Sequence, residues 1–113
     1  MDDKAASRLR QWRTAGEVPD GSGTGRQLDL MRRLSRAEIE PARFAKQWLD
    51  ARRLALNENE RLAEHLYRAL NQVFYALDEY PIDPAFREDG DTTDAELLDI
   101  VNQTLERIGG TGD

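Results

Sequence analysis

Residues 62–81 read LAEHLYRALNQVFYALDEYP, and this stretch decides the fold. Its apolar side chains recur at steps of three and four, which is the spacing of one face of an α-helix. The stripe and the residues that widen it are Leu62, Leu66, Ala69, Val73, Leu77, Tyr67, Leu70 and Phe74. Pro81 and Pro84 end the pattern, because a proline disfavours helix in the residue before it. We predict a well-buried helix that starts near Asn57 to Asn59, since Asn57 has capping-box spacing with Glu60.

Three further segments have helical periodicity. A first short helix is predicted over residues 28–34, and a second opens at Pro41, where a missing amide proton costs nothing in the first turn. The apolar face of the second helix is Phe44, Ala45, Trp48, Ala51 and Ala55. The last helix opens at Thr93, with Glu96 at capping-box spacing, and its apolar face is Leu97, Val101, Leu105 and Ile108. With no segment of strand periodicity, the expected fold is all-α, an antiparallel four-helix bundle.

The first two dozen residues have a different composition. Residues 19–25 read PDGSGTG, and three glycines there cost too much backbone entropy for a helix, so we interpret the segment as a linker. Ahead of it, Ala5, Leu9 and Trp12 recur at helical spacing and predict either a short extra helix that docks through Trp12 or a frayed arm. The predicted organisation is an N-terminal arm and linker over 1–23 and a helical domain over 24–113.

Length and composition favour one small intracellular domain. The chain has 113 residues, of which 39% are hydrophobic, and a core of that size has to be held by packing because there is no cysteine. No apolar run approaches the roughly 20 residues of a membrane span. The charged start at 1–4 is not followed by a signal-like apolar block, so we expect a soluble cytoplasmic protein without membrane contact, as a monomer or weak dimer.

The charge is distributed unevenly along the chain. The formal net charge is -6, with 12 bases and 8 acids up to Asn57 but 4 bases and 14 acids from Glu58 onward. A negative protein repels phosphate backbones and acidic lipid, so direct nucleic-acid binding is not expected. The acidic second half is where a partner is to be sought.

Candidate catalytic and metal-binding residues are few. The single histidine, His65, has no nucleophile motif around it, and we expect it on a helix surface. The segment 89–96 resembles a calcium loop in composition only, because its glycine is misplaced and the bidentate glutamate is missing. Glu60 and Glu64 lie one turn apart on what we expect to be a solvated face, where carboxylates are poor catalysts. We therefore expect no enzyme, cofactor or metal site, and an enzyme that uses these three side chains is the remote alternative.

The densest cluster of acids lies between Asp78 and Asp99, where Arg87 is the only base. Like charges so close together destabilise a compact state, and those at a helix C-terminus also oppose the macrodipole. We therefore predict a docking surface for a positive partner, with Tyr80 as an amphipathic anchor. Its candidate residues are Asp78, Glu79, Tyr80, Asp83, Arg87, Glu88, Asp89 and Asp91. The alternative is that Asp78 or Asp83 caps the following turn, that Arg87 pairs with one of them, and that the remaining acids only keep the domain soluble.

The order of these features resembles a known family. The chain resembles the colicin D immunity protein family, a group of bacterial self-protection proteins. In the first half the resemblance rests on residues 28–34, then on Glu38-Ile39, Phe44 and the run at 51–54. The second half is the stronger match and consists of VFYALDEY at 73–80, a proline, Asp83, Arg87, an acidic loop, and an amphipathic helix from Glu96 to Ile108. The resemblance leaves the first two dozen residues unexplained.

The resemblance implies a four-helix bundle that binds the C-terminal nuclease domain of a colicin-like, tRNA-cleaving toxin. Immunity proteins of this kind cover the cationic catalytic cleft with acids that take the place of tRNA phosphates. Asp78 and Asp83 match acids that face the toxin, whereas Pro81 stands where the family carries another acid, a departure that Glu88, Asp89 and Asp91 could offset. The alternative function is a helical adaptor or regulatory module without a toxin partner.

Overall fold

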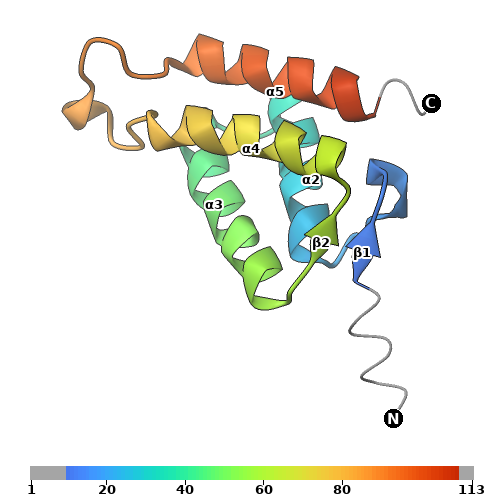
Figure 1. Ribbon diagram of the computed structural model, residues 1–113. Helices are drawn as coiled ribbons and strands as arrows, with labels where there is room; N and C mark the ends of the chain where they lie inside the picture. Colours follow the sequence, from blue (N-terminus) through green and yellow to red (C-terminus); the bar gives the residue numbers. More distant parts are fainter. Residues whose placement is uncertain (1–9, 110–113) are drawn as a thin grey trace.

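The computed structural model describes residues 10–109, and its regular secondary structure is helical except for two short strands (Figure 1). The elements in chain order are β1 (Gln11–Trp12), η1 (Ala15–Glu17), α2 (Gly23–Ser35), α3 (Pro41–Asn57), β2 (Arg61–Leu62), α4 (Glu64–Asp78), η2 (Pro84–Phe86) and α5 (Asp94–Ile108). The predicted all-α class is confirmed. No helix of the described residues is long and apolar enough to span a bilayer.

The four helices form two antiparallel hairpins, one of α2 and α3 and the other of α4 and α5 (Figure 1). The second hairpin lies across the upper end of the first, so the bundle is crossed. The core between them is apolar, and its largest fully buried side chains include Trp48, Phe44, Leu28, Met31 and Leu66. Burial of this surface is the main favourable term in folding a domain that has no cross-link.

The apolar faces predicted for the second and last helices are confirmed. All five residues predicted for α3 are buried, and Pro41 occupies its first turn. In α5 the capping box of Thr93 and Glu96 is present, and Leu105 is partly rather than fully buried. In both helices the spacing of the apolar residues and the local signals at the helix start were sufficient to identify the buried face.

The predicted start of the third helix is wrong. The α3 helix continues to Asn57, the chain reverses through Asn59 with φ of 56°, and α4 begins at Glu64. Leu62 lies in β2, Tyr67 is exposed and Phe74 is half-buried. The remaining stripe of α4, Leu66, Ala69, Leu70, Val73 and Leu77, is buried as expected.

Glu60 caps a distant helix and not its own. Its carboxylate accepts hydrogen bonds from the backbone N–H of Gly23 and of Thr24, both at 2.9 Å, and from the Thr24 hydroxyl at 2.7 Å. Its side chain has no exposed surface, and the Arg10 guanidinium lies 3.7 Å from it. The expectation of a solvated Glu60 is therefore wrong, because the unpaired donors at the N-terminus of α2 favour a carboxylate there.

The interpretation of residues 19–25 as a linker is also wrong. Gly23, Thr24 and Gly25 form the first turn of α2 and are buried, and the Ser22 hydroxyl caps that helix by accepting from the Gly25 N–H at 2.9 Å. A Cβ at Gly23 would overlap the backbone of α3, and one at Gly25 would overlap the Pro19 carbonyl. These glycines permit close packing of backbones, and the predicted boundary between residues 23 and 24 falls within this first turn.

The segment before α2 packs on the helices as an extended chain. Gln11 pairs with Arg61 and Trp12 with Leu62 in a two-stranded parallel sheet, although no strand was predicted. Trp12 packs against the core, as the docking alternative required, but from a strand and not from a helix. Ala5 and Leu9 lie outside the described residues.

We predict that Gly25→Ala destabilises the protein by about 2 to 3 kcal/mol, because the added methyl group meets backbone that cannot move aside. Gly21→Ala is the matched control, since nothing lies within 4 Å of its added Cβ, and we expect a change within about 0.5 kcal/mol. Urea unfolding of both variants measures this difference. Equal stabilities would restore the linker interpretation.

We predict a similar contrast between two glutamates. Glu60→Ala leaves three donors at the start of α2 without their acceptor and costs about 3 kcal/mol. Glu64→Ala removes only an exposed ion pair with Arg68 and costs less than about 1 kcal/mol. Thermal unfolding followed by circular dichroism reports both, and a Glu60→Ala protein as stable as Glu64→Ala would contradict the burial of this carboxylate.

Candidate partner-binding surface

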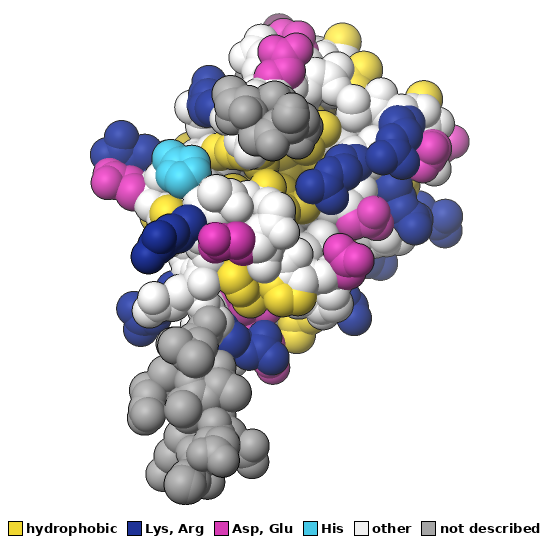
Figure 2. Space-filling model, turned by 90° about the vertical axis from the view of Figure 1, so that its right-hand side faces the viewer, with side chains coloured by type: hydrophobic (Ala, Val, Ile, Leu, Met, Phe, Trp, Pro, Cys, Tyr) yellow, Lys and Arg dark blue, Asp and Glu magenta, His cyan; other side chains and the backbone are white. Residues whose placement is uncertain are grey.

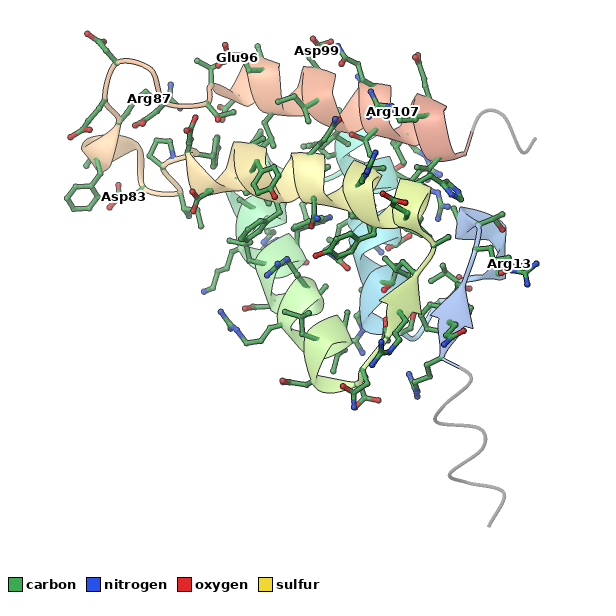
Figure 3. All side chains as sticks on the ribbon, in the orientation of Figure 1. Arg13, Asp83, Arg87, Glu96, Asp99 and Arg107 are labelled. Carbon is green, nitrogen blue, oxygen red and sulfur yellow. The ribbon has the colours of Figure 1, made fainter. Side chains whose placement is uncertain are left out.

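The predicted acids gather at one end of the second hairpin, around the loop that joins α4 to α5 (Figure 1). Asp83 and Arg87 project from this loop, and Glu96 and Asp99 project from the outer side of α5 (Figure 3). We define the acidic end as Asp78, Glu79, Asp83, Glu88, Asp89, Asp91, Asp94, Glu96 and Asp99. All of these are exposed except Asp91, which is half-buried.

The base of the loop is fixed to the helices. The Thr92 hydroxyl donates to the carbonyl of Ala76 at 2.9 Å, and the Thr92 N–H donates to the carbonyl of Glu79 at 2.8 Å. Thr92 is buried, so both bonds are protected from water. The loop therefore leaves and rejoins the hairpin at defined points and is not a solvated tail.

Tyr80 holds the loop from inside and is not an exposed anchor. Its side chain is buried in the core cluster, and its hydroxyl donates to the Asp94 carboxylate at 2.5 Å. Burial, reinforced by this bond, raises the pKa of the Tyr80 hydroxyl well above its usual value. Sequence reasoning placed Tyr80 on the docking surface because it could not show which side of the turn faces the core.

Two of the predicted acids stabilise turns within the loop. The Asp83 carboxylate accepts from the Ala85 N–H at 2.9 Å, and the Asp91 carboxylate accepts from the Glu88 N–H at 2.7 Å. The turn at Gly90 has φ of 92°, which glycine adopts without strain. The turn-capping alternative therefore holds for Asp83, and Asp91, which it did not name, caps a turn in the same way. These bonds fix the direction in which the two carboxylates point.

The acidic end has almost no compensating base. Within residues 10–109 the only ion pair that it makes joins Arg87 to Asp94 at 4.0 Å, and both side chains are largely exposed. Such a pair contributes little in water. The side that carries β1 is different, because Figure 2 shows basic and acidic side chains interspersed there. The densest uncompensated negative charge of the described residues thus lies at this end of the molecule.

Two exposed apolar side chains lie among these acids. Phe86 is 75% exposed and Ile82 is 40% exposed, and both belong to the loop. They offer the apolar contact that we had assigned to Tyr80. In the sequence, the signal for such a contact is an aromatic residue inside an acidic loop. Asp94, Glu96 and Asp99 belong to the same cluster of acids but were not among the predicted site residues.

The residues weighed for catalysis are not brought together into a catalytic site. His65 lies on the surface of α4, as expected, and Figure 2 shows it on the side that carries β1. Glu64 pairs with Arg68 on the surface, whereas Glu60 is buried at the start of α2. Among residues 10–109, no three potential ligands from His, Asp and Glu are grouped as a metal site requires.

Comparison with known proteins gives one finding. A family model described as bacterial self-protective colicin-like immunity matches residues 26–108. That range includes all four helices except the first turn of α2, together with the whole acidic loop. No curated protein and no solved structure matches the chain.

We predict that Tyr80 makes stability depend on pH in the alkaline range. Because its folded-state pKa lies above the unfolded value of about 10, its contribution is complete below pH 10 and is lost as the pH rises further. Tyr80→Phe removes the bond to Asp94, costs about 1 kcal/mol at neutral pH, and weakens the alkaline loss. Tyr75→Phe, at a position that is 63% exposed, is the control and keeps the wild-type pH profile in urea titrations.

Proposed function

The chain belongs to the family of bacterial self-protective colicin-like immunity proteins, and from this premise we propose how it neutralises its toxin. We infer that the acidic end enters the cationic catalytic cleft of a cognate nuclease domain of the colicin D type, which cleaves tRNA. The carboxylates there take the positions of RNA phosphates and so exclude the substrate. The observation that carries the proposal is the cluster of nine acids with one exposed ion pair at one end of the molecule.

Electrostatics supports this choice of partner. A nuclease cleft has to bind phosphates, so it presents Lys and Arg side chains at spacings that suit anionic oxygens. Carboxylates that meet such a cleft form charge-assisted hydrogen bonds and accelerate the encounter of the two proteins. The negative end of α4 and the loop acids repel one another in the free protein, and a cationic partner removes that repulsion.

The rigidity of the loop supports the mimicry. Its ends are fixed by Thr92 and Tyr80, and its turns are held by Asp83 and Asp91. A surface that is already ordered loses less conformational entropy on binding than a flexible tail does. The acids can therefore contact the cleft without a large ordering cost, and Phe86 and Ile82 add apolar surface among them.

On this proposal the protein inhibits by occlusion and performs no chemistry. It competes with tRNA for the cleft, and its effect depends on binding affinity and not on turnover. Since tRNA is cytoplasmic, neutralisation takes place in the cytoplasm. A helical adaptor without a toxin partner is the alternative function, and a nuclease toxin encoded immediately upstream would favour immunity over it.

We predict that the double variant Asp78→Lys with Asp83→Lys abolishes toxin neutralisation while helicity remains near wild type. Both side chains are exposed, so the changes affect the docking surface more than the core. The measurements are survival of cells that express the toxin nuclease domain and the affinity of the purified proteins. Association of the wild type should also slow as salt rises, because steering charges are screened over about 8 to 10 Å at physiological ionic strength.

The control carries the same change in charge at the opposite end of the hairpin. Glu64→Lys with Glu106→Lys alters exposed residues at the start of α4 and the end of α5, and we expect it to protect cells as wild type does. Full protection by the Asp78 and Asp83 double variant would place the docking surface elsewhere. Association that does not depend on salt would argue for an apolar interface centred on Phe86 and Ile82.

A further inference from the structure

A groove of about 660 Å³ runs between α2 and α3. The core residues Phe44 and Trp48 do not line it, so it lies on the outer side of the first hairpin. Exposed charged side chains form its rim, and its floor is apolar and consists of Leu30, Ala51 and Leu54. Leu54 is half-buried, so a partner can still contact it from outside.

Each wall of the groove carries a row of exposed charges. Residues three and four apart lie on one face of a helix, and on both helices such positions are mostly basic. The row on α2 and its C-cap is Arg26, Asp29, Arg33 and Arg36, and the row on α3 is Arg43, Lys46, Asp50 and Arg53. We define the basic face as these two rows together with Arg32, which also lines the groove. Asp20 is the only other acid in the lining.

Four of the seven bases of the basic face have no acid beside them. Arg33, Arg36 and Arg53 each pair with an acid close in sequence, at 3.1 to 3.8 Å. These acids include Asp29 and Asp50, so both carboxylates of the rows are already engaged. The bases that make no ion pair with any of residues 10–109 are Arg26, Arg32, Arg43 and Lys46. The basic face therefore keeps an excess of positive charge in a protein whose net charge is -6.

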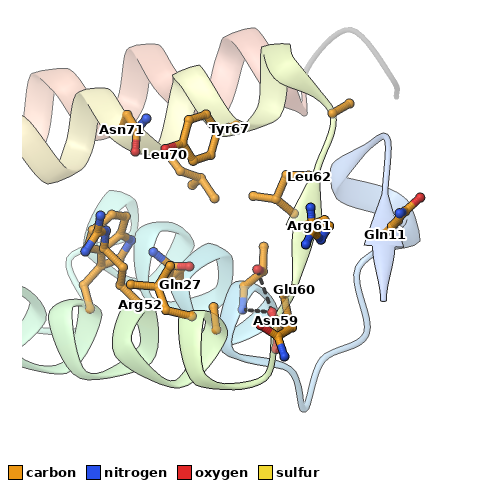
Figure 4. A pocket seen from close by; sticks show the side chains of 15 residues that line it. Gln11, Gln27, Arg52, Asn59, Glu60, Arg61, Leu62, Tyr67, Leu70 and Asn71 are labelled. Atoms are coloured by element: carbon orange, nitrogen blue, oxygen red, sulfur yellow. Dashed lines mark hydrogen bonds between the residues drawn. The ribbon is translucent and has the colours of Figure 1, made fainter. Parts of the chain in front are cut away.

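The two walls of the groove are fixed relative to each other. The Glu60 carboxylate, which follows α3, holds the first turn of α2 through Thr24 (Figure 4). In the same turn, Gly23 lies so close to the backbone of Ala51 and Ala55 that a Cβ would not fit. The groove is therefore formed before a partner binds, and binding costs little conformational entropy on this side of the contact.

The acidic end is the complement of the basic face. It has nine acids and one base, and its exposed apolar side chains, Phe86 and Ile82, stand among the acids. The basic face has the reverse charge, with an apolar floor between two rows of bases. Opposite charge patterns steer two protein surfaces together and fix their register, and apolar contact at the centre of an interface adds affinity.

These two surfaces do not meet within one molecule. The acidic end makes its only ion pair of the described residues between Arg87 and Asp94, which are both its own neighbours in the loop region. An occupant of the groove has to come from outside, and every solution of this protein contains one with the matching surface, a second copy. RNA fits the basic face less well, because phosphates do not use an apolar floor and the net negative charge of the protein repels them.

We propose that the acidic end of one copy docks in the groove of a second copy. Phe86 then lies against Leu54, and the loop acids face the unpaired bases of the basic face. Because the two surfaces of this contact differ, the association is head-to-tail, and each copy can engage two neighbours. The contact is weak, since ion pairs that stay exposed to water contribute little.

Self-association of this kind competes with toxin binding, because both use the acidic end. This consequence rests on the proposed function, whereas the docking of two copies does not. Dilute protein is then free to bind the toxin, and concentrated protein partly covers its own acidic end.

Sedimentation velocity of the full chain over a range of concentrations tests the contact. We expect the average mass of the wild type to rise with concentration at low salt. It should return to that of the monomer as salt is added, because charges are screened over about 10 Å at 0.1 M salt and about 3 Å at 1 M. A wild type that remains monomeric at millimolar concentration and low salt overturns the proposal.

Two double variants each remove one of the two surfaces. Asp78→Lys with Asp83→Lys changes the acidic end, and Arg26→Glu with Arg32→Glu changes the groove. We expect each to weaken self-association at least about tenfold, since steering and pairing both depend on these charges. Circular dichroism reports whether the variants fold. Arg43→Glu with Lys46→Glu, at exposed positions on the other wall, replaces the groove variant if that one unfolds.

The mixture of these two variants is the sharpest test. The groove variant has an intact acidic end and the other has an intact groove, so together they should form one contact. We expect a one-to-one pair that does not grow further, whereas the wild type forms longer chains. A mixture without this pair shows that the two surfaces do not bind each other and overturns the proposal.

The matched control reverses two exposed bases away from the groove. Arg13→Glu with Arg61→Glu makes the same change in net charge beside β1 and β2, where Figure 3 shows Arg13 projecting from the molecule. We expect it to change self-association by less than about twofold. A loss as large as that of the groove variant would mean that net charge alone governs association, against the proposal.

Two further partners separate the remaining outcomes. If the wild type binds added tRNA and the groove variant loses that binding while neither self-associates, the basic face binds nucleic acid and the proposal fails. A toxin nuclease domain should disperse the self-associated protein, and one that binds without dispersing it would contradict the shared use of the acidic end. If no nuclease domain binds, the proposed function fails, and the variants alone decide whether two copies dock.

Discussion

The buried carboxylate of Glu60 at the start of α2 is the interaction on which the rest of the arrangement depends. It joins the turn between α3 and α4 to a helix that begins 37 positions earlier in the chain. That turn is followed at once by β2, which pairs with β1, and then by α4, so the position of Glu60 sets where the second hairpin crosses the first. The same contact brings Gly23 against the backbone of α3, which a side chain there would prevent. A carboxylate is suited to this role because the N-terminal donors of a helix and its macrodipole both favour negative charge.

The separation along the chain between the partners of each interaction decides whether the sequence alone could predict it. The faces of α3 and α5 were predictable, since helical spacing and the capping box of Thr93 are read within a few residues of the chain. The roles of Glu60 and of Gly23 to Gly25 were not, because both depend on partners far away in sequence. Glycine-rich composition has two physical causes, backbone freedom and the need for close approach, and only tertiary structure distinguishes them. The candidate site shows the same distinction. The cluster of acids is a local property of residues 78–99, whereas the burial of Tyr80 is a product of packing.

The acidic end shows how a fold can accommodate charged side chains that destabilise it. Asp78 and Glu79 lie at the C-terminal end of α4, where the macrodipole disfavours them, and the loop that follows adds further acids. The fold offsets this electrostatic cost with local hydrogen bonds that leave the negative charge in place. They are made by Thr92, by Tyr80 with Asp94, and by the turn-capping carboxylates of Asp83 and Asp91. Stabilisation by Lys or Arg would have been simpler, but it would have removed the negative field. The arrangement keeps the acids exposed and in place, which suits a surface that meets a cationic partner.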